Sequence, residues 1–362
     1  MLAEILRLYP DADLFALVDF LPHAERGALH GKRARTSFLQ HIPFARSGFR
    51  MLLPLFPRAV ESLDVSAYDL VISSSHAVAK GARTRAPQVH ICYCYTPMRY
   101  AWDLRDQYLA QTGLDRGLRG FVATRILSRL RTWDRAASAR VDHFVAISNY
   151  IAERIRRSYA RDSTVIYPPV TVDESVEPTT PRGSCYVTVS QLVPYKRIDL
   201  IVEAFGRLPE RELVVIGEGP ERGRIAAIAP RNVRLMGRLG DAERNRWLAG
   251  ARAFIFAAEE DFGIAPLEAQ AVGTPVIAYA GGAVSETIRG LDAIAPSGVL
   301  YGEQSAAAIA GAVAEFERNE SRIAASACRD NARRFDAARF RREFRHFVDA
   351  RMSGRRNEAA HR

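Results

Sequence analysis

Lysine is scarce in this chain, although the chain is strongly basic. Lys32, Lys80 and Lys196 are the only lysines among its 51 lysine and arginine residues, and the formal net charge is +10. A preference for arginine that extends over the whole sequence indicates codon composition, and no nucleic-acid-binding motif accompanies it. The charge therefore does not predict a nucleic-acid partner, and the place of each lysine becomes informative.

Other absences exclude further classes of protein. The four cysteines lack the spacing of a metal site or of a CxxC motif, so we expect no bound metal and small core thiols in a reducing compartment. No apolar run reaches the roughly 18 residues that cross a membrane. The sequence after Met1 is not that of a signal peptide. Together these features predict a cytoplasmic protein.

Patterns typical of strands and helices alternate along the chain, and its 362 residues suggest two domains. In the second half we expect strands at 186–190, 213–217, 233–236, 253–257 and 276–279, separated by helices at 198–207, 221–229 and 242–249. In the first half we expect strands at 14–18, 70–73, 90–93 and 143–147. Such alternation implies an α/β fold with parallel, doubly wound sheets.

Two glutamates frame one strand–loop–helix unit. Glu260 follows the apolar run 253–257, Gly263 breaks the strand, and Pro266 suits the first position of a helix that has Glu268 in its first turn. This places both glutamates at the carboxyl edge of the expected parallel sheet. Ligands of open α/β sheets bind at that edge, and a carboxylate there can accept hydrogen bonds from neighbouring hydroxyls. The alternative is that Glu268 complements the helix dipole and Glu260 is a solvated loop acid.

The sequence EDFGIAPLE at 260–268 resembles the Glu-x7-Glu signature of the family 4 retaining glycosyltransferases, which have the GT-B architecture of two Rossmann-like domains. The resemblance implies that Glu260 contacts the hydroxyls of the donor sugar and that Glu268 contacts the nucleotide ribose. The backbone amides of Phe262, Gly263 and Ile264, at the helix start, are then expected to face the donor diphosphate.

The loop at 190–197 reads SQLVPYKR. In the family this loop usually carries an arginine and, five residues later, a lysine that together neutralise the diphosphate. Lys196 matches the lysine, but Gln191 replaces the arginine and brings no charge. We expect Arg197 to share the contact with the phosphates; the alternative is a solvated basic helix start.

The resemblance also assigns Gly237 and Arg238 to a loop that holds the nucleobase largely through its backbone. The segment IGEGPER at 216–222 begins like a dinucleotide fingerprint, but Arg222 stands where the third glycine belongs. A nicotinamide dehydrogenase is therefore the least favoured interpretation of the chain.

On the acceptor side, His76 ends a strand-like run, where a lone histidine is more often a satisfied loop residue. By resemblance, it corresponds to the family histidine that approaches the donor sugar. Lys80 nearby is expected either to bind an acceptor phosphate or to lie on the surface. The segment CYCYTPMRYAW at 92–102 resembles a stretch of a bacterial subgroup that assembles O-antigen and exopolysaccharide, with Tyr95 in place of a histidine. Arg99 and Tyr100 then form an acceptor wall, unless this is a packed aromatic loop.

Arginines and apolar residues recur at helical spacing between residues 116 and 140. This basic amphipathic helix is either a solvated domain face or a surface that docks on anionic lipid at the inner face of the plasma membrane. The second interpretation suits a lipid-linked acceptor.

The resemblance also sets the expected domains. We expect an N-terminal, acceptor-side domain at 1–168, a proline-rich linker, a nucleotide-sugar-binding domain at 183–336 and a final helix, about 337–352, that returns to the first domain. Because the chain starts with a helical pattern at 2–8, we expect the N-terminal domain to lack its first strand.

The expected activity is transfer of a hexose with retention of its anomeric configuration, preferably mannose from GDP-mannose, to a lipid-linked or polysaccharide acceptor. His76, Lys196 and Glu260 are the residues expected at the reacting end of the donor, and no separate protein nucleophile is indicated. The alternative is a non-catalytic sugar-nucleotide-binding partner of a polysaccharide assembly complex, which Gln191, Tyr95 and the abrupt start motivate.

Overall fold

The computed structural model describes residues 1–102, 109, 116–171 and 182–360. The chain divides into two compact units. Unit 1 comprises Met1–Pro168 and Phe340–Arg362, and unit 2 comprises Pro169–Arg339. The expected linker falls mostly at 172–181, outside the described residues.

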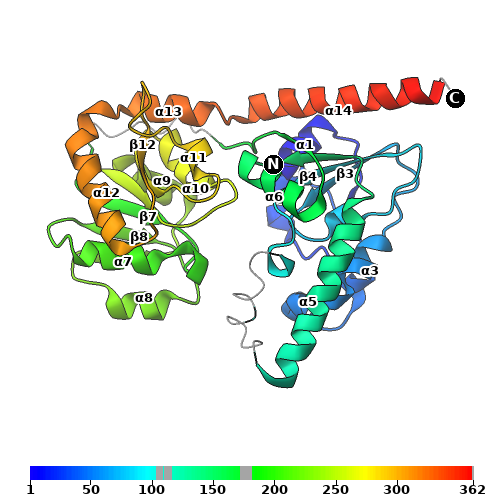
Figure 1. Ribbon diagram of the computed structural model, residues 1–362, viewed down its shortest axis with the longest axis horizontal. Coiled ribbons are helices and arrows are strands. Elements are labelled where there is room, and N and C mark those ends of the chain that lie inside the picture. The colour runs from blue at the N-terminus through cyan, green and yellow to red at the C-terminus, as the bar shows by residue number, and fades with distance from the viewer. Residues whose placement is uncertain (103–108, 110–115, 172–181, 361–362) are drawn as a thin grey trace. The chain divides into compact units, whose positions relative to one another are not determined.

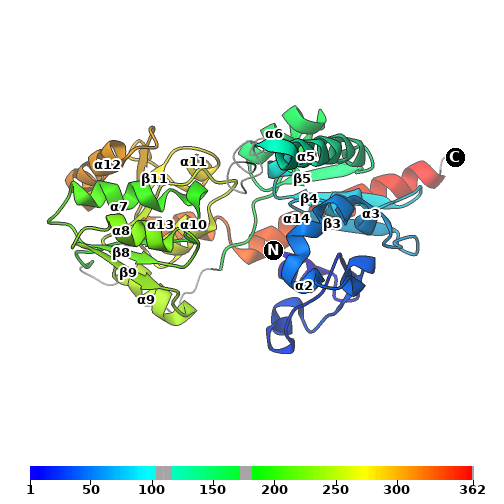
Figure 2. The ribbon, with the colours of Figure 1, turned by 90° about the horizontal axis from the view of Figure 1, so that it is seen from below.

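Unit 2 is built on a six-stranded sheet in which every pairing is parallel. Its strand order is β12-β11-β10-β7-β8-β9, and β9 forms one edge beside β8 (Figure 2). The strands are β7 (Tyr186–Val189), β8 (Leu213–Ile216), β9 (Val233–Gly237), β10 (Ala253–Phe256), β11 (Val276–Tyr279) and β12 (Gly298–Tyr301). This is the doubly wound order, so the expectation of a parallel Rossmann-like sheet is confirmed.

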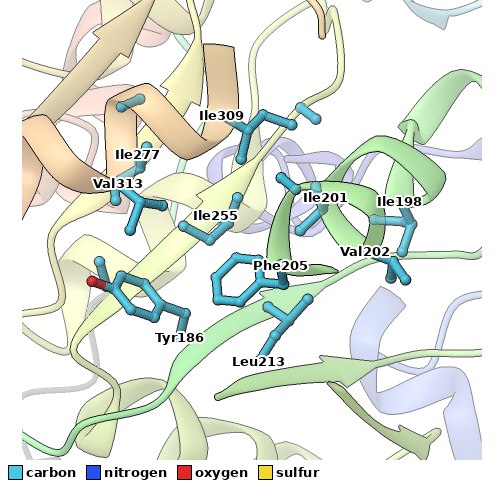
Figure 3. Close-up of a cluster of buried hydrophobic side chains, with 14 of the residues drawn as sticks. Tyr186, Ile198, Ile201, Val202, Phe205, Leu213, Ile255, Ile277, Ile309 and Val313 are labelled. Carbon is cyan, nitrogen blue, oxygen red and sulfur yellow. The ribbon is translucent and has the colours of Figure 1, made fainter. Parts of the chain in front are cut away.

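Helices cover both faces of this sheet, because neighbouring strand residues point to opposite sides. Leu213 and Ile255 pack with α7 and α12 in one core (Figure 3), whereas Val214 and Phe254 pack with α9, α10 and α11 in the other. The helices are α7 (Ile198–Gly206), α8 (Arg222–Ile228), α9 (Asp241–Gly250), α10 (Ile264–Ala271), α11 (Val284–Thr287), α12 (Ala306–Asn319) and α13 (Ala325–Arg333), with short 3-10 helices at Pro194–Lys196 and Glu320–Arg322. These elements run from green to orange in Figure 1.

Unit 1 contains a parallel four-stranded sheet, β3-β4-β5-β6, and a separate parallel pair, β1-β2. The strands are β1 (Leu14–Ala16), β2 (Ala34–Thr36), β3 (Leu70–Ser75), β4 (Val89–Cys94), β5 (His143–Ala146) and β6 (Ser163–Val165). The helices are α1 (Leu2–Leu8), α2 (Ala45–Gly48), α3 (Phe56–Glu61), α5 (Gly117–Ser138), α6 (Asn149–Tyr159) and α14 (Ala337–Ala360), with 3-10 turns at His23–Leu29, Phe38–His41, Phe49–Leu55, Ala79–Gly81 and Arg99–Ala101. The expected strand at 14–18 thus exists, but it pairs with β2 and not with the larger sheet.

The C-terminal helix α14 packs on unit 1. Its Phe340 and Phe344 rings meet Tyr93 of β4 at centroid distances of 5.8 and 5.9 Å. On β5, Phe144 faces the other way and stacks on Tyr159 of α6. The four-stranded sheet is therefore covered by α14 on one face and by α6 on the other, and Figure 1 shows α14 and α5 on opposite sides of β3 and β4.

Candidate functional site

The candidate donor site lies at the carboxyl edge of the unit 2 sheet, between β7 and β10. These strands are neighbours, and the chain leaves β7 toward β8 but leaves β10 toward β11. The loops therefore diverge at this switch point, which is where doubly wound sheets bind ligands. Lys196 lies in the loop after β7, and Glu260 lies in the loop after β10.

Lys196 and Glu260 form an ion pair across this switch point. Their side chains retain 20% and 19% of their exposed area, so the pair is accessible but largely shielded from water. The ammonium also lies 5.4 Å from the ring centroid of Tyr195 and 6.0 Å from that of Phe256. Such a pair holds a hydrogen-bond donor for phosphate and an acceptor for hydroxyls in one place.

The backbone of Glu260 is fixed by the segment that precedes α11. The Ala283 N–H donates to the Glu260 carbonyl at 2.8 Å, and Glu260 forms a parallel bridge with Gly282. Gly282 has φ +73°, and a Cβ at this position would lie 2.2 Å from the Glu260 carbonyl oxygen. Only glycine fits this close approach without displacing Glu260.

The start of α10 corrects one expectation. Gly263 adopts φ +84° as the N-cap, and the helix begins at Ile264, two residues before Pro266. Glu268 therefore lies in the second turn and not in the first. Phe262 is buried and packs edge-on against Phe335, whereas Ile264 is 52% exposed. The orientation of the three amides toward a diphosphate stays a prediction.

Glu268 is half-buried on α10. Burial raises the pKa of its carboxyl above the ordinary range, an effect that Arg244 opposes and Asp241 reinforces. A desolvated carboxylate gains most from a partner that donates hydrogen bonds to it, as two ribose hydroxyls would.

Arg197 is turned to protein partners. It has a left-handed backbone conformation, its Nε lies 3.3 Å from Asp199 Oδ1, and its Nη1 donates to Gln304 Oε1 at 3.2 Å. Gln304 in turn donates to the Ala257 carbonyl at the end of β10 at 2.7 Å. In this arrangement Arg197 braces the site; Gln191 is exposed in the same loop.

The expected nucleobase loop is also at this edge. The Gly237 carbonyl, at the end of β9, accepts a 2.8 Å hydrogen bond from the Gly217 N–H, and Arg238 is exposed. Beside Gly237, Glu218 and Arg222 form an ion pair. Arg222, which breaks the dinucleotide fingerprint, thus serves in a surface pair of the turn after β8.

His76 follows the last residue of β3 and is exposed. Desolvation of the ring by the surrounding protein and the positive charge of Lys80 lower its pKa. The imidazole is therefore neutral at neutral pH and can both accept and donate a hydrogen bond.

Lys80 corrects an expectation. Neither of the two proposed roles, acceptor contact or surface residue, fits, because its side chain has no exposed area. Its ammonium pairs with the equally buried Asp134 of α5 and donates to the Ala77 carbonyl at 2.7 Å. Tyr159 and Trp102 donate to the same carboxylate at 2.6 and 2.9 Å. Burial of a charge requires this kind of pairing, so Lys80 ties α5 to the turn that carries His76.

The expected acceptor wall follows β4. Tyr95, Arg99 and Tyr100 are half-buried, and the Tyr95 hydroxyl accepts a 3.4 Å hydrogen bond from Ser74. Burial raises the pKa of that phenol. Beyond them, a surface cavity of about 470 Å³ is lined by Trp102, Arg131, Thr132, Arg135 and Ala136.

Three residues that hold these sites escaped the sequence reasoning: Asp134, Gly282 and Gln304. Asp134 is the one whose sequence context carries a signal, because it is an acid on the apolar side of an arginine-rich helix. Among the described residues, no group of three or more His, Cys, Asp or Glu side chains is arranged to hold a metal ion. Within the same residues no helix is both long and apolar enough to cross a bilayer.

Comparisons with known proteins agree with the fold. Two family models match in succession, "Glycosyltransferase Family 4" over residues 16–174 and "Glycosyl transferases group 1" over residues 175–335. The chain is 29% identical over 184 residues to the GDP-mannose-dependent monoacylated alpha-(1-6)-phosphatidylinositol monomannoside mannosyltransferase of Corynebacterium glutamicum. The aligned region covers 42% of this chain and 48% of that protein. The chain is 43% identical over 72 residues to the phosphatidyl-myo-inositol mannosyltransferase of Propionibacterium freudenreichii, which covers 19% of this chain and 17% of that protein.

The matched regions thus span less than half the length of these curated relatives. Among solved structures, HepE of Anabaena in complex with UDP is similar, with a TM-score of 0.67, 17% identity and coverage of 96% of this chain and 95% of that one. At this identity the likeness shows the fold alone, and it confirms the fold expected from the sequence.

Proposed function

The chain belongs to family 4 of the glycosyltransferases and has the GT-B fold, and we propose that it transfers a hexose from a nucleotide diphosphate sugar to a lipid-linked or polysaccharide acceptor with retention of configuration. The observation that carries the proposal is the Lys196–Glu260 pair at the switch point of the unit 2 sheet, with Glu268 on α10, the helix that follows Glu260 in the chain. This arrangement places a cation that can donate hydrogen bonds to phosphate beside two carboxylates that can accept hydrogen bonds from hydroxyls, at the edge where such sheets bind ligands.

In the proposed reaction Lys196 exchanges Glu260 for the donor diphosphate. Its ammonium then stabilises the negative charge that develops on the leaving group. Glu260, released from the ion pair, accepts hydrogen bonds from the sugar hydroxyls, and Glu268 accepts them from the ribose. No side chain is nominated as nucleophile, so the acceptor hydroxyl attacks the anomeric carbon from the face that the diphosphate leaves. The new glycosidic C–O bond forms as the bond from that carbon to the diphosphate breaks, and the departing phosphate oxygen takes the proton of the hydroxyl. The neutral His76 of unit 1 keeps the role that the family resemblance predicts for it, because its imidazole can both accept and donate a hydrogen bond.

We propose GDP-mannose as the donor. Support comes from the two curated relatives, whose names describe mannosyltransferases and, in one case, GDP-mannose dependence. The same names contain phosphatidylinositol and so support a lipid acceptor. The expected nucleobase loop is predicted to hold the base largely through its backbone, so its sequence does not identify the base and a panel of donors is the direct test.

The test is a thermal-shift screen of GDP-, UDP- and dTDP-sugars, followed by transfer assays with the sugar nucleotide that binds. We expect the melting temperature to rise with GDP-mannose, because a ligand that binds only the folded state stabilises it. Glu260→Gln should lower turnover at least tenfold, with Glu259→Gln, the exposed neighbour, as the control. Full turnover in Glu260→Gln would contradict the site assignment. Donor binding without transfer or donor hydrolysis would favour the non-catalytic partner.

We also propose that unit 1 contacts anionic membrane lipid through α5. Leu118, Phe121 and Val122 are 79%, 65% and 48% exposed near the start of this helix, and exposed arginines accompany them. Exposed apolar side chains beside arginines are typical of helices that lie in a membrane interface.

A further inference from the structure

A buried network of amide, hydroxyl and backbone carbonyl groups lies behind the proposed donor site, and the Arg334 guanidinium donates to Asn331 Oδ1 in it at 2.8 Å. Gln270 of α10 and Asn331 of α13 have no exposed area, and Asn331 Nδ2 donates to Gln270 Oε1 at 2.6 Å. Thr287 and Ser297 are equally buried; Thr287 contributes its backbone carbonyl and Ser297 its hydroxyl. Buried amides are costly unless they are paired, so the arrangement of this network is strongly constrained.

The network converges on one backbone atom, the Thr287 carbonyl oxygen at the end of α11. Gln270 Nε2 donates to it at 3.1 Å, and Asn331 Nδ2 donates to it at 2.8 Å. Gln270 Nε2 also lies 3.2 Å from the Pro266 carbonyl of its own helix. The position of α11 relative to α10 is thereby set by two amides from two different helices.

Both proposed donor-binding carboxylates depend on these helices. Glu268 precedes Gln270 by two residues on α10. Glu260 is held through its carbonyl by Ala283, which immediately precedes α11. A shift of α11 would therefore move Glu260, whereas a shift of α10 would move Glu268.

We infer that Gln270 and Asn331 are positioning residues of the donor site, which fix α11 against α10 so that Glu260 and Glu268 meet one donor molecule together. The inference rests on the proposed function. An apolar contact between the helices would bury the same surface, but hydrogen bonds are directional and specify one offset. The two amides touch neither sugar nor nucleotide; they act through the glutamates.

The test compares Gln270→Met and Asn331→Leu, which keep side-chain size and remove the amide. The control is Val313→Ala, a core truncation of α12 in the other core of the same unit. Dissociation constants for the nucleotide sugar that the wild-type chain binds are measured by calorimetry, well below each melting temperature. Hydrogen exchange of residues 281–288 is followed in parallel. Should Gln270→Met not fold, Gln270→Asn, which keeps the amide but shortens its reach, replaces it.

We expect both amide variants to weaken donor binding at least tenfold and to accelerate exchange at 281–288. Val313→Ala should leave binding within twofold at a similar loss of melting temperature. Donor affinity within twofold of wild type in the amide variants would overturn the inference and leave the proposed function standing. A wild-type chain that binds none of the GDP-, UDP- and dTDP-sugars would overturn the proposed function, and this inference with it.

Discussion

At the residue scale, the proposed donor contact of Glu268 comes at a cost to stability. Its raised pKa means that ionisation is less favourable in the folded chain than in the unfolded chain. The cost is full at a pH above the folded pKa, and it disappears below the unfolded pKa. An ionised Glu268 is nevertheless what two ribose hydroxyls require, and this is a common compromise at binding sites.

Glu268→Gln should therefore separate the two effects. We expect a melting temperature equal to or above that of wild type at pH 7, with the difference vanishing as the pH falls below the ordinary carboxyl range. Donor affinity should fall about tenfold or more, because a hydrogen bond to a charged group contributes roughly 1.5–3 kcal/mol. Calorimetric melting between pH 3 and 8 and donor titration between pH 4 and 8 measure the two effects. A variant that is less stable at pH 7 would contradict the argument.

Lys80 makes the opposite case, in which a charge stabilises through one specific partner. Lys80→Met leaves the Asp134 carboxylate buried without its cation, and we expect a loss of about 3–5 kcal/mol in the free energy of unfolding. Adding Asp134→Asn should recover part of that loss, because it removes the uncompensated charge. Urea unfolding of the two single variants and the double variant measures the coupling. Additive losses would show that the pair does not interact.

At the element scale, the segment before α11 matters because a backbone contact sets the place of Glu260. Gly282→Ala puts a Cβ 2.2 Å from the Glu260 carbonyl oxygen, at a positive φ that a side chain rarely adopts. We expect the 2.8 Å bond from Ala283 to lengthen or break, and donor affinity to fall at least tenfold. Gly302→Ala, where no atom lies within 4 Å of the added Cβ, is the matched control. Equal affinities in the two variants would contradict this role of Gly282.

The strands and their carboxyl ends could be predicted from the sequence, whereas the long-range side-chain contacts that hold the site residues in place could not. The apolar run 253–257 predicts β10, and the motif around Glu260 places a carboxylate after it, because both are local patterns. The burial of Lys80 depends on Asp134, 54 positions later, and no local pattern encodes that contact. Asn331 reaches Gln270 across 61 positions in the same way. Ordinary polar residues acquire such roles only when the elements pack.

At the scale of the whole molecule, the strongly positive charge acquires a physical role if unit 1 meets an anionic surface. On α5, Arg119, Arg125 and Arg129 are all exposed, and the same helix exposes Leu118 and Phe121. Each basic side chain near an anionic leaflet is worth about 1 kcal/mol. Replacement of the three arginines by glutamine should therefore weaken binding to vesicles rich in anionic lipid by roughly 100-fold, since 1.4 kcal/mol is a factor of ten.

The control for this last prediction keeps the net charge of the variant but spares α5. Arg207, Arg231 and Arg318 are exposed on unit 2, and their replacement by glutamine removes the same charge. If attraction were due to net charge alone, both triple variants would lose vesicle binding equally, and the assignment to α5 would be wrong. Co-sedimentation with anionic and with zwitterionic vesicles at several salt concentrations measures the difference. A specific loss in the α5 variant, reduced at high salt, is the expected result, because salt screens the arginine–lipid attraction that the wild-type helix provides.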